Sequence, residues 1–262
     1  MLGTDFRTGS PNWLDLGSPD IPVASAFYSA VFGWRFVPAG PDTGGYGFFQ
    51  REGRTVAAIG QLTEEAASSA WMLHFHTPDL QATTAAVREG GGSVRMEPMD
   101  VMGEGWLGQF TDPQGAEFAC WQPGRTAGFE MASAENALVW AELHVPDPVA
   151  AIGFYAGLFG WRSAEMQAPG MTYRVLSIAD GDQEDGSFGG VVPLTGDGEQ
   201  ARWVPYFHVL DADAITAEVT ANGGSVLMPA ADVPDVGRIA WVSDPAGAVF
   251  ALLTPDPRTD GR

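Results

Sequence analysis

The sequence has little cysteine, few basic residues and no long apolar run. Its single cysteine, Cys120, excludes an intrachain disulfide, which suits a reducing compartment. The N-terminal residues MLGTDFRTGSPNW lack a basic start followed by an apolar stretch, so no secretory signal is predicted. No stretch approaches the ~20 apolar residues of a membrane helix. We therefore expect a cytoplasmic protein without a membrane partner.

Positive charge is also scarce. The chain has 13 Lys and Arg against 33 Asp and Glu, a net charge of −20. Binding to nucleic acid depends on Lys and Arg contacts to phosphate, so nucleic acid is not an expected partner. Hydrophobic residues make up 45% of the 262 residues, enough for a core in one large domain or two ordinary ones.

An internal repeat is the most prominent feature that is present. FYSAVFGW at 27–34 returns as FYAGLFGW at 154–161, an offset of 127 residues. GGSV at 91–94 returns at 223–226, an offset of 132, and DPxGxxF at 112–118 returns with the same offset. The five extra residues are expected in the acidic stretch DGDQEDG at 180–186.

A repeat of this length indicates a domain duplication. We predict one domain at 10–124, a linker at 125–136 and a second domain at 137–256. Within each domain a strand, a helix and three more strands occur twice, because Asp or Pro-Asp favours helix starts and Gly favours helix ends. The fold class is therefore α+β, built from four βαβββ units. The helices are expected at 21–33, 80–91, 148–160 and 214–224.

The strand–Asp–helix–FYxxxFGW pattern, the GG turn and DPxGxxF resemble the vicinal oxygen chelate superfamily. This superfamily includes glyoxalase I, bleomycin-resistance proteins, extradiol dioxygenases and methylmalonyl-CoA epimerase. The WxDL and WxEL first strands resemble its two-domain CFP-30B-like hydroxylase group. The resemblance implies two cup-shaped mixed sheets with helices outside, each made by a pair of units and each able to hold a ligand.

Strand alternation predicts which side chains face the cups. In the strand ending at Asp147, the apolar set Ala141, Leu143 and Val145 is expected to pack under the helices. The residues of the other parity are expected to line the first cup, namely Trp13, Asp15, Gly17, Met72, His74, His76, Glu117, Ala119 and Trp121. The corresponding residues of the second cup are Trp140, Glu142, His144, Val204, Tyr206, His208, Val249, Ala251 and Leu253.

The resemblance also says where a metal would bind. Metal-dependent members place His or Glu seven residues before the helix-start Asp, and Glu seven residues after the Asp of DPxG. Good ligands are carboxylates, imidazoles and thiolates, and this chain has none of them at those positions. The positions hold Trp13, Met72, Ala119, Trp140, Val204 and Ala251. We therefore expect no metal at the usual positions and no cofactor.

A shifted metal site is an alternative. Asp15, His74 and Glu117 each lie two residues from a usual ligand position. If the first and last strands of a unit run antiparallel, these shifts keep the three side chains level. They would then bind Fe(II), Mn(II) or Zn(II), with His76 as a fourth group. The other interpretation is a polar cup floor in which the histidine hydrogen-bonds the acids.

The second cup offers a different chemistry. Glu142, His144, Tyr206 and His208 form a possible general acid–base set. Glu142, or the matching Asp15, would act as the base, and His76 occupies the position that matches His208. Alternatively, the acids hydrogen-bond backbone or Trp N–H groups and only fix the cup.

Three tryptophans are predicted on the cup faces: Trp13, Trp121 and Trp140. They would form an aromatic wall for a flat ligand, or fill the cups where a metal would otherwise be. Trp34 and Trp161 are predicted core residues, and Cys120 is predicted in the core rather than as a nucleophile.

Three functions remain open. The first is a small-molecule binding protein for an apolar or aromatic metabolite, whose ligand contacts are Trp13, His74, Glu117, Trp121, Trp140, His144 and Tyr206. The second is an enzyme: a metal-independent acid–base catalyst that uses Asp15, Glu142, His76 or His208, or a hydroxylase, dioxygenase or lyase that uses the shifted site. The third is a protein-interaction role. The chain is expected to be a monomer or a homodimer.

Overall fold

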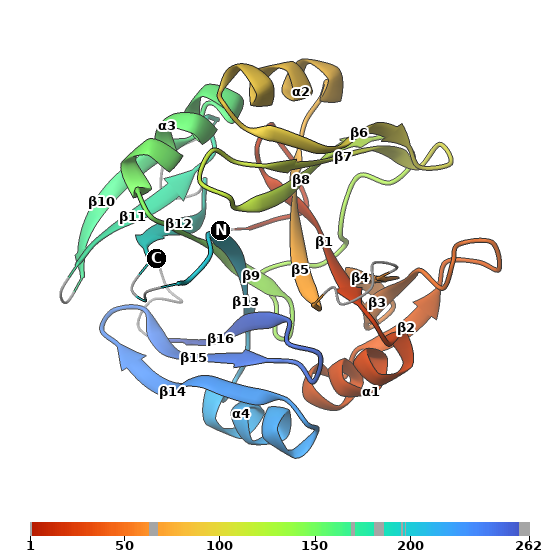
Figure 1. The fold of residues 1–262 in the computed structure, drawn as a ribbon. Helices are drawn as coiled ribbons and strands as arrows, with labels where there is room; N and C mark the ends of the chain where they lie inside the picture. The colour runs from red at the N-terminus through yellow and green to blue at the C-terminus, as the bar shows by residue number, and fades with distance from the viewer. Residues whose placement is uncertain are drawn as a thin grey trace. The chain divides into compact units, whose positions relative to one another are not determined.

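The structure is a computed structural model that describes residues 2–62, 68–168, 171–180, 186–194, 196 and 198–256. Residues 181–185, in the stretch predicted to hold the insertion, lie outside the described residues. Four successive βαβββ modules make up the described chain, as the sequence predicts (Figure 1).

The modules follow the repeat closely. Module 1 has β1 (Pro11–Ser18), α1 (Ile21–Phe32), β2 (Arg35–Pro38), β3 (Gly47–Arg51) and β4 (Arg54–Gln61). Module 2 has β5 (Ala70–His76), α2 (Leu80–Glu89), β6 (Ser93–Asp100), β7 (Gly105–Thr111) and β8 (Glu117–Pro123). Module 3 has β9 (Leu138–Val145), α3 (Pro148–Phe159), β10 (Arg162–Ala168), β11 (Met171–Ser177) and β12 (Ser187–Pro193). Module 4 has β13 (Arg202–His208), α4 (Ala212–Ala221), β14 (Ser225–Val233), β15 (Gly237–Ser243) and β16 (Val249–Pro255).

The strands form two mixed sheets of eight strands each. Their orders are β2-β3-β4-β1-β5-β8-β7-β6 and β10-β11-β12-β9-β13-β16-β15-β14. Within a module the first strand pairs in parallel with the last, as in β1 with β4 and β5 with β8, while the other pairs are antiparallel. The α+β prediction is confirmed, and the expectation that first and last strands run antiparallel is wrong.

Local chemistry explains where the helices begin and end. In α1 the Asp20 carboxylate accepts the Val23 N–H at 3.0 Å, and Gly33 closes the helix at a φ of 68°. Such a left-handed residue costs little only for glycine. Helix α4 begins two residues earlier than predicted, because Asp211 rather than Asp213 is its N-cap.

The described chain divides into two compact units that cut across the repeat. Unit 1 contains the chain up to Trp13, Met72–Gly128 and Trp140–Val204, so it combines module 2 with module 3. Unit 2 contains Leu14–Trp71, Phe129–Val139 and the chain from Pro205, so it combines module 1 with module 4. In Figure 1, α2 packs beside α3 in unit 1, and α1 packs beside α4 in unit 2.

The repeated motifs hold each unit together. In unit 1, Tyr155 of FYAGLFGW donates its hydroxyl to Asp112 Oδ2 of DPQGAEF at 3.2 Å. Asp112 Oδ1 accepts the backbone N–H groups of Gln114 and Ala116 at 2.8 and 2.9 Å. In unit 2, Tyr28 makes the same bond to Asp244 Oδ2 at 3.3 Å. The octapeptide of each half therefore fastens the DPxG turn of the other half.

These bonds are buried, and burial sets their electrostatics. Loss of water raises the pKa of Asp112 and of Asp244, although the backbone hydrogen bonds to each carboxylate partly oppose this. Burial also raises the pKa of Tyr155 and Tyr28 well above the usual range, and the neighbouring carboxylate adds to the shift. The tyrosines therefore remain protonated donors at neutral pH.

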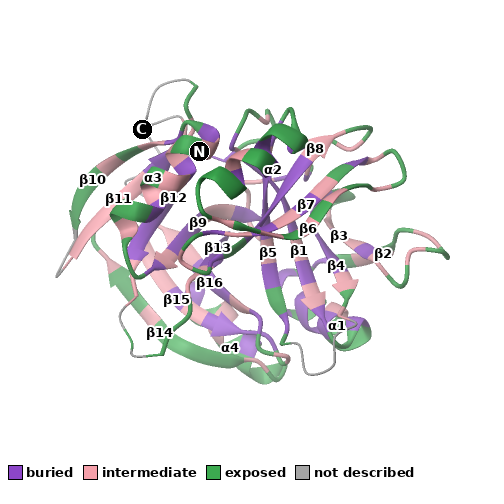
Figure 2. Cartoon of the chain, turned by 45° about the horizontal axis from the view of Figure 1, so that its top comes forward, coloured by how far each residue is buried: buried purple, intermediate pink, exposed green. Residues whose placement is uncertain are grey.

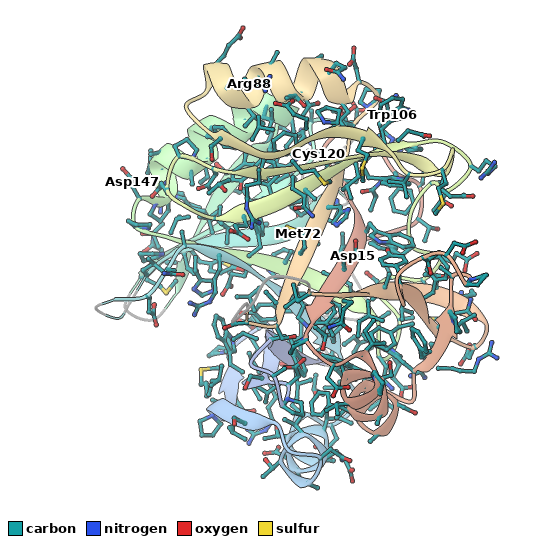
Figure 3. The ribbon with its side chains drawn as sticks, turned by 45° about the vertical axis from the view of Figure 1, so that its right-hand side comes forward. Asp15, Met72, Arg88, Trp106, Cys120 and Asp147 are labelled. Carbon is teal, nitrogen blue, oxygen red and sulfur yellow. The ribbon has the colours of Figure 1, made fainter. Side chains whose placement is uncertain are left out.

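Aromatic rings fill both cores. Trp161 stacks on Tyr155 with ring centroids 4.9 Å apart, and Trp34 stacks on Tyr28 at 5.6 Å. Both tryptophans are almost completely buried, which confirms their predicted core role. Cys120, marked on β8 in Figure 3, is fully buried, and burial raises the pKa of its thiol well above the usual range. It is a core residue, as predicted.

Exposure is concentrated at the sheet ends. Strand β14, at the end of its sheet, is exposed along most of its length, whereas the central strands are mostly buried (Figure 2). Among the described helices, none has the length and apolar character needed to cross a membrane.

Candidate functional site

The predicted alternation along β9 is present. Ala141, Leu143 and Val145 are completely buried. Trp140 and His144, of the other parity, are partly exposed, and Glu142 between them is 8% exposed. One face of β9 therefore belongs to the core of unit 1, and the opposite face carries Trp140, Glu142 and His144.

A tyrosine from β11 joins these three side chains. Trp140 Nε1 donates to the Tyr173 hydroxyl at 2.9 Å. The Tyr173 hydroxyl is hydrogen-bonded to Glu142, and Glu142 Oε1 lies 2.8 Å from His144 Nε2. We call Trp140, Tyr173, Glu142 and His144 the Glu142 cluster. It is a continuous hydrogen-bonded chain from an indole to an imidazole, contained entirely in unit 1.

The environment of the cluster keeps Tyr173 protonated. Burial raises the pKa of Tyr173 well above its usual range, and the Glu142 charge raises it further. The hydrogen bond from Trp140 opposes this shift without cancelling it. The hydroxyl accepts from the indole, so its own proton is directed to Glu142.

A glycine makes this contact possible. Strand β12 lies between β11 and β9, and Gly190 of β12 is directly opposite Glu142. A Cβ atom on Gly190 would lie 2.0 Å from the Tyr173 hydroxyl oxygen, far inside contact distance. The Tyr173 side chain therefore reaches Glu142 across a strand position that only glycine allows.

The first half contains a shorter version of this arrangement, in unit 2. The Tyr46 hydroxyl donates to Asp15 Oδ1 at 2.7 Å. Asp15, on β1 (Figure 3), matches Glu142, and Tyr46 matches Tyr173 at the same offset of 127. We call Asp15 and Tyr46 the Asp15 pair. Gly17 stands at the position that corresponds to His144 in the second half.

Sequence reasoning missed both tyrosines of these sites. Tyr46 and Tyr173 lie in dissimilar surroundings, GGYGFF and PGMTYR, and so they fall outside every matched run. The signal was nevertheless present. Both are tyrosines separated by the same 127 residues as FYSAVFGW and FYAGLFGW.

The predicted metal site from Asp15, His74 and Glu117 does not fit the structure. Strands β5 and β8 are parallel with His74 opposite Ala119, so Glu117 lies two positions away instead of level with His74. Glu117 is half-exposed and forms an ion pair with Arg95 at 2.6 Å. Over the part of the chain that the structure describes, no group of three or more His, Cys, Asp or Glu could hold a metal ion.

Of the other residues predicted at the first cup, Trp121 and His74 are buried and His76 is partly exposed. The Trp121 N–H donates to the Thr126 carbonyl at 2.8 Å, and its ring covers Gly105. His74 is 1% exposed. Burial lowers the pKa of His76, which a hydrogen bond to the Arg7 backbone partly offsets.

Two further predicted site residues lie in unit 2. Tyr206 is buried, and its ring meets Trp241 edge-on with centroids 6.3 Å apart. His208 is partly exposed at the end of β13, where its backbone bonds those of Asn136 and Ala137. Of the predicted acid–base set, the structure brings Glu142 and His144 into contact. Trp13, also predicted at the first cup, is 8% exposed.

Known proteins resemble this chain over nearly its whole length. The family model "Glyoxalase/Bleomycin resistance protein/Dioxygenase superfamily" matches residues 10–119 and 137–252. "Putative glyoxylase CFP32" of Mycobacterium tuberculosis is 36% identical over 97% of this chain and 98% of its own. "Anthracycline biosynthesis protein DnrV" of Streptomyces peucetius is 36% identical over 95% of this chain and 94% of its own.

Solved structures agree in fold. A 2,2',3-trihydroxybiphenyl 1,2-dioxygenase from Sphingomonas wittichii aligns with a TM-score of 0.64 at 14% identity, over 95% of this chain and 91% of its own. A Mn(II)-bound glyoxalase from Novosphingobium aromaticivorans aligns with a TM-score of 0.62 at 18% identity, over 95% and 82%. At these identities the likeness concerns the fold alone.

Proposed function

The chain belongs to the glyoxalase/bleomycin resistance protein/dioxygenase superfamily, and from that premise we propose that it binds a flat, hydroxylated aromatic metabolite at the Glu142 cluster. The observation that carries this proposal is the hydrogen-bonded chain from Trp140 through Tyr173 and Glu142 to His144. Each of its members is polar, and the Glu142 and His144 side chains are only 11% and 12% exposed.

The energetic cost of this arrangement supports a role beyond folding. Placing a carboxylate where water is largely excluded is unfavourable unless hydrogen bonds compensate for it. The core of unit 1 already contains the buried hydrogen bond between Tyr155 and Asp112, so the Glu142 cluster is not needed to hold that core together. A surface of carboxylate, imidazole and indole suits a ligand with a hydroxyl beside an aromatic ring.

The relatives support the aromatic part of the proposal. One of them, DnrV, is named for anthracycline biosynthesis, and an anthracycline has a flat, polycyclic, hydroxylated ring system. The usual metal positions are occupied by Trp13 and Trp140 on the two first strands. The donor set therefore favours a ligand held by hydrogen bonds and ring contacts over one chelated to a metal.

A second candidate function is a metal-independent acid–base enzyme. The contact between His144 and Glu142 favours it, because a carboxylate that orients an imidazole is a common catalytic arrangement. In this reading the His144–Glu142 pair removes a proton from the bound ring and returns it elsewhere. Turnover of the ligand distinguishes this function from simple binding.

The test is calorimetric titration with alizarin, a dihydroxyanthraquinone, as the probe. We expect micromolar binding to the wild type and at least a tenfold weaker Kd, about 1.4 kcal/mol, for Glu142→Gln. Glu165→Gln is the matched control, because Glu165 is an exposed carboxylate of the same unit that pairs with Arg174. Absence of heat for the wild type, or equal affinity in Glu142→Gln, contradicts the proposal.

The same samples test the second candidate. Chromatography of the probe after overnight incubation should return it unchanged if the protein only binds. Conversion by the wild type that is lost in Glu142→Gln would establish the acid–base enzyme instead.

A further inference from the structure

Unit 1 contains a cleft that is separate from the Glu142 cluster. The N-terminal segment, residues 2–10, lines it together with the chain after β11 and the start of β12, and its volume is about 210 Å³. The buried residues of its lining are all apolar: Leu2, Pro11 and Phe188. The exposed residues of its lining include three charged ones, Asp5, Arg7 and Asp180. We call it the Phe188 cleft. Its interior is apolar and its rim is charged.

The N-terminal segment is fixed where it meets the core of unit 1. Trp161 Nε1 donates to the Gly9 carbonyl at 3.0 Å. The Gly9 N–H donates to the His76 carbonyl at 2.9 Å, and the His76 N–H donates to the Ser10 carbonyl at 2.8 Å. The Ser10 hydroxyl in turn accepts the Arg7 N–H at 2.9 Å. These bonds hold one wall of the cleft in place.

The chain before β9 is the counterpart of this segment in unit 2, and it is anchored in the same way. Asn136 matches Gly9 at the offset of 127, and its carbonyl accepts the Trp34 Nε1–H at 2.8 Å. The Asn136 N–H donates to the His208 carbonyl at 2.7 Å, and the His208 N–H donates to the Ala137 carbonyl at 3.0 Å. Because both segments are fixed at equivalent points, their remaining residues can be compared position by position.

The segment of unit 2 carries larger side chains, and they are buried. Phe129 matches Leu2 and is 1% exposed. Met131 matches Thr4 and is 3% exposed, whereas Thr4 is an exposed residue. The segment of unit 2 therefore places more apolar volume against its core than the segment of unit 1 does.

A glycine makes the second difference between the two segments. In unit 2 Glu130 Oε2 accepts the Thr55 N–H at 2.7 Å, and the Glu130 N–H donates to the Thr55 carbonyl at 2.7 Å. Gly3 matches Glu130, and Ser187 of the cleft matches Thr55. A Cβ built on Gly3 would meet no described atom within 4 Å beyond its chain neighbours. Unit 1 therefore has open space where unit 2 has a bonded carboxylate.

The charges of the cleft favour a cation as its occupant. Asp5 and Asp180 supply two carboxylates and Arg7 supplies one guanidinium, so the lining has a net negative charge. The Arg7–Asp5 ion pair is 3.5 Å long with both side chains exposed, so water screens it and it opens easily. The whole chain has a net charge of −20, and a field of one sign raises the local concentration of ligands of the opposite sign.

The volume of the cleft limits the size of the occupant. Cavities for drug-sized ligands measure roughly 300–1,000 Å³, so the Phe188 cleft suits a smaller molecule with one ring or one branched alkyl group. Phe188 packs against Trp161 with ring centroids 4.8 Å apart, which gives the cleft a fixed apolar base. Covering Leu2 and Phe188 removes apolar surface from water and favours such a ligand.

We propose that the Phe188 cleft is a second small-molecule site, which binds a primary amine carried on a small apolar body. The apolar body lies against Leu2 and Phe188, and the ammonium group faces Asp5 and Asp180. No covalent bond is made or broken. The described lining of the cleft includes no member of the Glu142 cluster, so this site does not depend on the function proposed above.

The first test is an NMR titration of the full chain with benzylamine. Benzyl alcohol and benzoate carry the same ring with no charge and with a negative charge. We expect benzylamine to shift the backbone amide signals of Arg7, Ile178 and Phe188 with a Kd on the order of 1 mM. Benzyl alcohol should bind at least fivefold more weakly, and benzoate more weakly still. Benzoate binding as tightly as benzylamine would overturn the amine assignment, and the absence of shifts at these three residues would overturn the site.

The second test removes both carboxylates in the double variant Asp5→Asn/Asp180→Asn. Both residues are exposed, so the fold should be retained. We expect the Kd for benzylamine to rise about tenfold and the preference over benzyl alcohol to disappear. The matched control is Glu97→Gln/Glu165→Gln, which changes the charge of unit 1 equally at exposed partners of Arg88 and Arg174. An equal loss of affinity in the control would assign the effect to overall charge and overturn the proposal.

The third test fills the cleft without a change of charge. Gly3→Gln introduces a long polar side chain at the position that matches Glu130 of unit 2. The open space around Gly3 accommodates the new side chain, so we expect a folded protein whose affinity for benzylamine is at least tenfold lower. An unchanged affinity in Gly3→Gln would overturn the inference, because the open space at Gly3 would then have no part in binding.

Discussion

Two pairs of tyrosines recur at the same spacing of 127 residues but in different surroundings. Tyr28 and Tyr155 lie inside nearly identical octapeptides, and each donates to the aspartate of a DPxG turn. Tyr46 and Tyr173 lie in unlike sequences and donate to different acids, Asp15 and Glu142. The first pair has been kept alike in both halves, and the second has diverged.

The difference separates what the fold requires from what a site requires. The surroundings of Tyr155 must match those of Tyr28 because the same helix packs on the same turn in each unit. The surroundings of Tyr173 are under no such constraint. In this duplicated chain, the tyrosine–acid hydrogen bonds of Tyr46 and Tyr173, which lie in unlike sequences, are therefore a better guide to a candidate site than the repeated octapeptides of Tyr28 and Tyr155.

The largest effect is expected from truncating the tyrosines of the conserved pair. Tyr155→Ala removes a fully buried ring and leaves Asp112 without one of its partners, so we expect a loss of about 3–5 kcal/mol in the free energy of unfolding. Tyr28→Ala should lower the free energy of unfolding by the same amount. Tyr173 is partly exposed, so Tyr173→Ala should lower it by less than half as much. Urea denaturation measures all three. Equal losses of unfolding free energy in Tyr155→Ala and Tyr173→Ala would contradict the distinction between the two pairs of tyrosines.

The next effect is expected at Gly190. Gly190→Ala places a methyl group against the Tyr173 hydroxyl, so we expect a loss of about 1–3 kcal/mol in stability. The free energy of alizarin binding should change by more than the free energy of unfolding, because displacement of the Tyr173 hydroxyl removes its hydrogen bond to Glu142. Ala58→Gly in the first half is the matched variant and should leave alizarin affinity at the second half unaltered. A fully active Gly190→Ala protein would contradict the role of this glycine.

A smaller effect is expected from the charge of Asp112. Burial raises its pKa above the usual value of 3.8, so the folded state holds the proton more tightly than the unfolded chain does. Its contribution to stability is therefore greatest below pH 3.8 and is lost as the pH rises through the raised pKa. Asp112→Asn removes this dependence at a cost on the order of 1 kcal/mol.

The measurement is the difference in unfolding free energy between variant and wild type from pH 3 to pH 7. As the pH rises, the unfolding free energy of the variant should increase relative to that of the wild type. Asp244→Asn should behave alike, since burial raises the pKa of Asp244 in the same way. A difference that moves in favour of the wild type would show that these carboxylates are stabilised in their charged form.

The smallest effect is expected from metal removal. The usual metal position within the Glu142 cluster is occupied by Trp140, and the Asp15/His74/Glu117 alignment fails because β5 and β8 are parallel. Dialysis against EDTA should leave alizarin affinity within twofold of its starting value. Elemental mass spectrometry provides the independent reading, and about one Fe, Mn or Zn per chain that disappears in His74→Ala would contradict this expectation.

Most of the fold was predictable because it depends on local signals. Asp20 and Asp147 begin helices and Gly33 and Gly160 end them for reasons contained in a few adjacent residues. The period-2 pattern placed Leu143 in the core and Glu142 on the opposite face. The strand directions were not local, and the assumption of antiparallel first and last strands produced the wrong metal alignment.

The site was predictable only in part. Glu142 and His144 are two residues apart on one strand, so their meeting follows from strand geometry alone. The contact of Glu142 with Tyr173 spans two strand pairings and depends on the glycine between them. The matched spacing of Tyr46 and Tyr173 marks the two tyrosines, but it does not reveal the acids that they contact, because those contacts are set by the order of strands in the sheet.

The grouping of modules into units also has a consequence for the order of events during synthesis. Unit 1 uses no residue beyond Val204, so all of its parts have been made once Val204 has left the ribosome. Unit 2 joins Leu14–Trp71 to the chain after Pro205, so the first module must wait until the last one has been translated. Contacts of such long sequence separation form slowly. Helix α1 packs beside α4, so its buried side chains gain this partner only after the last module has been translated.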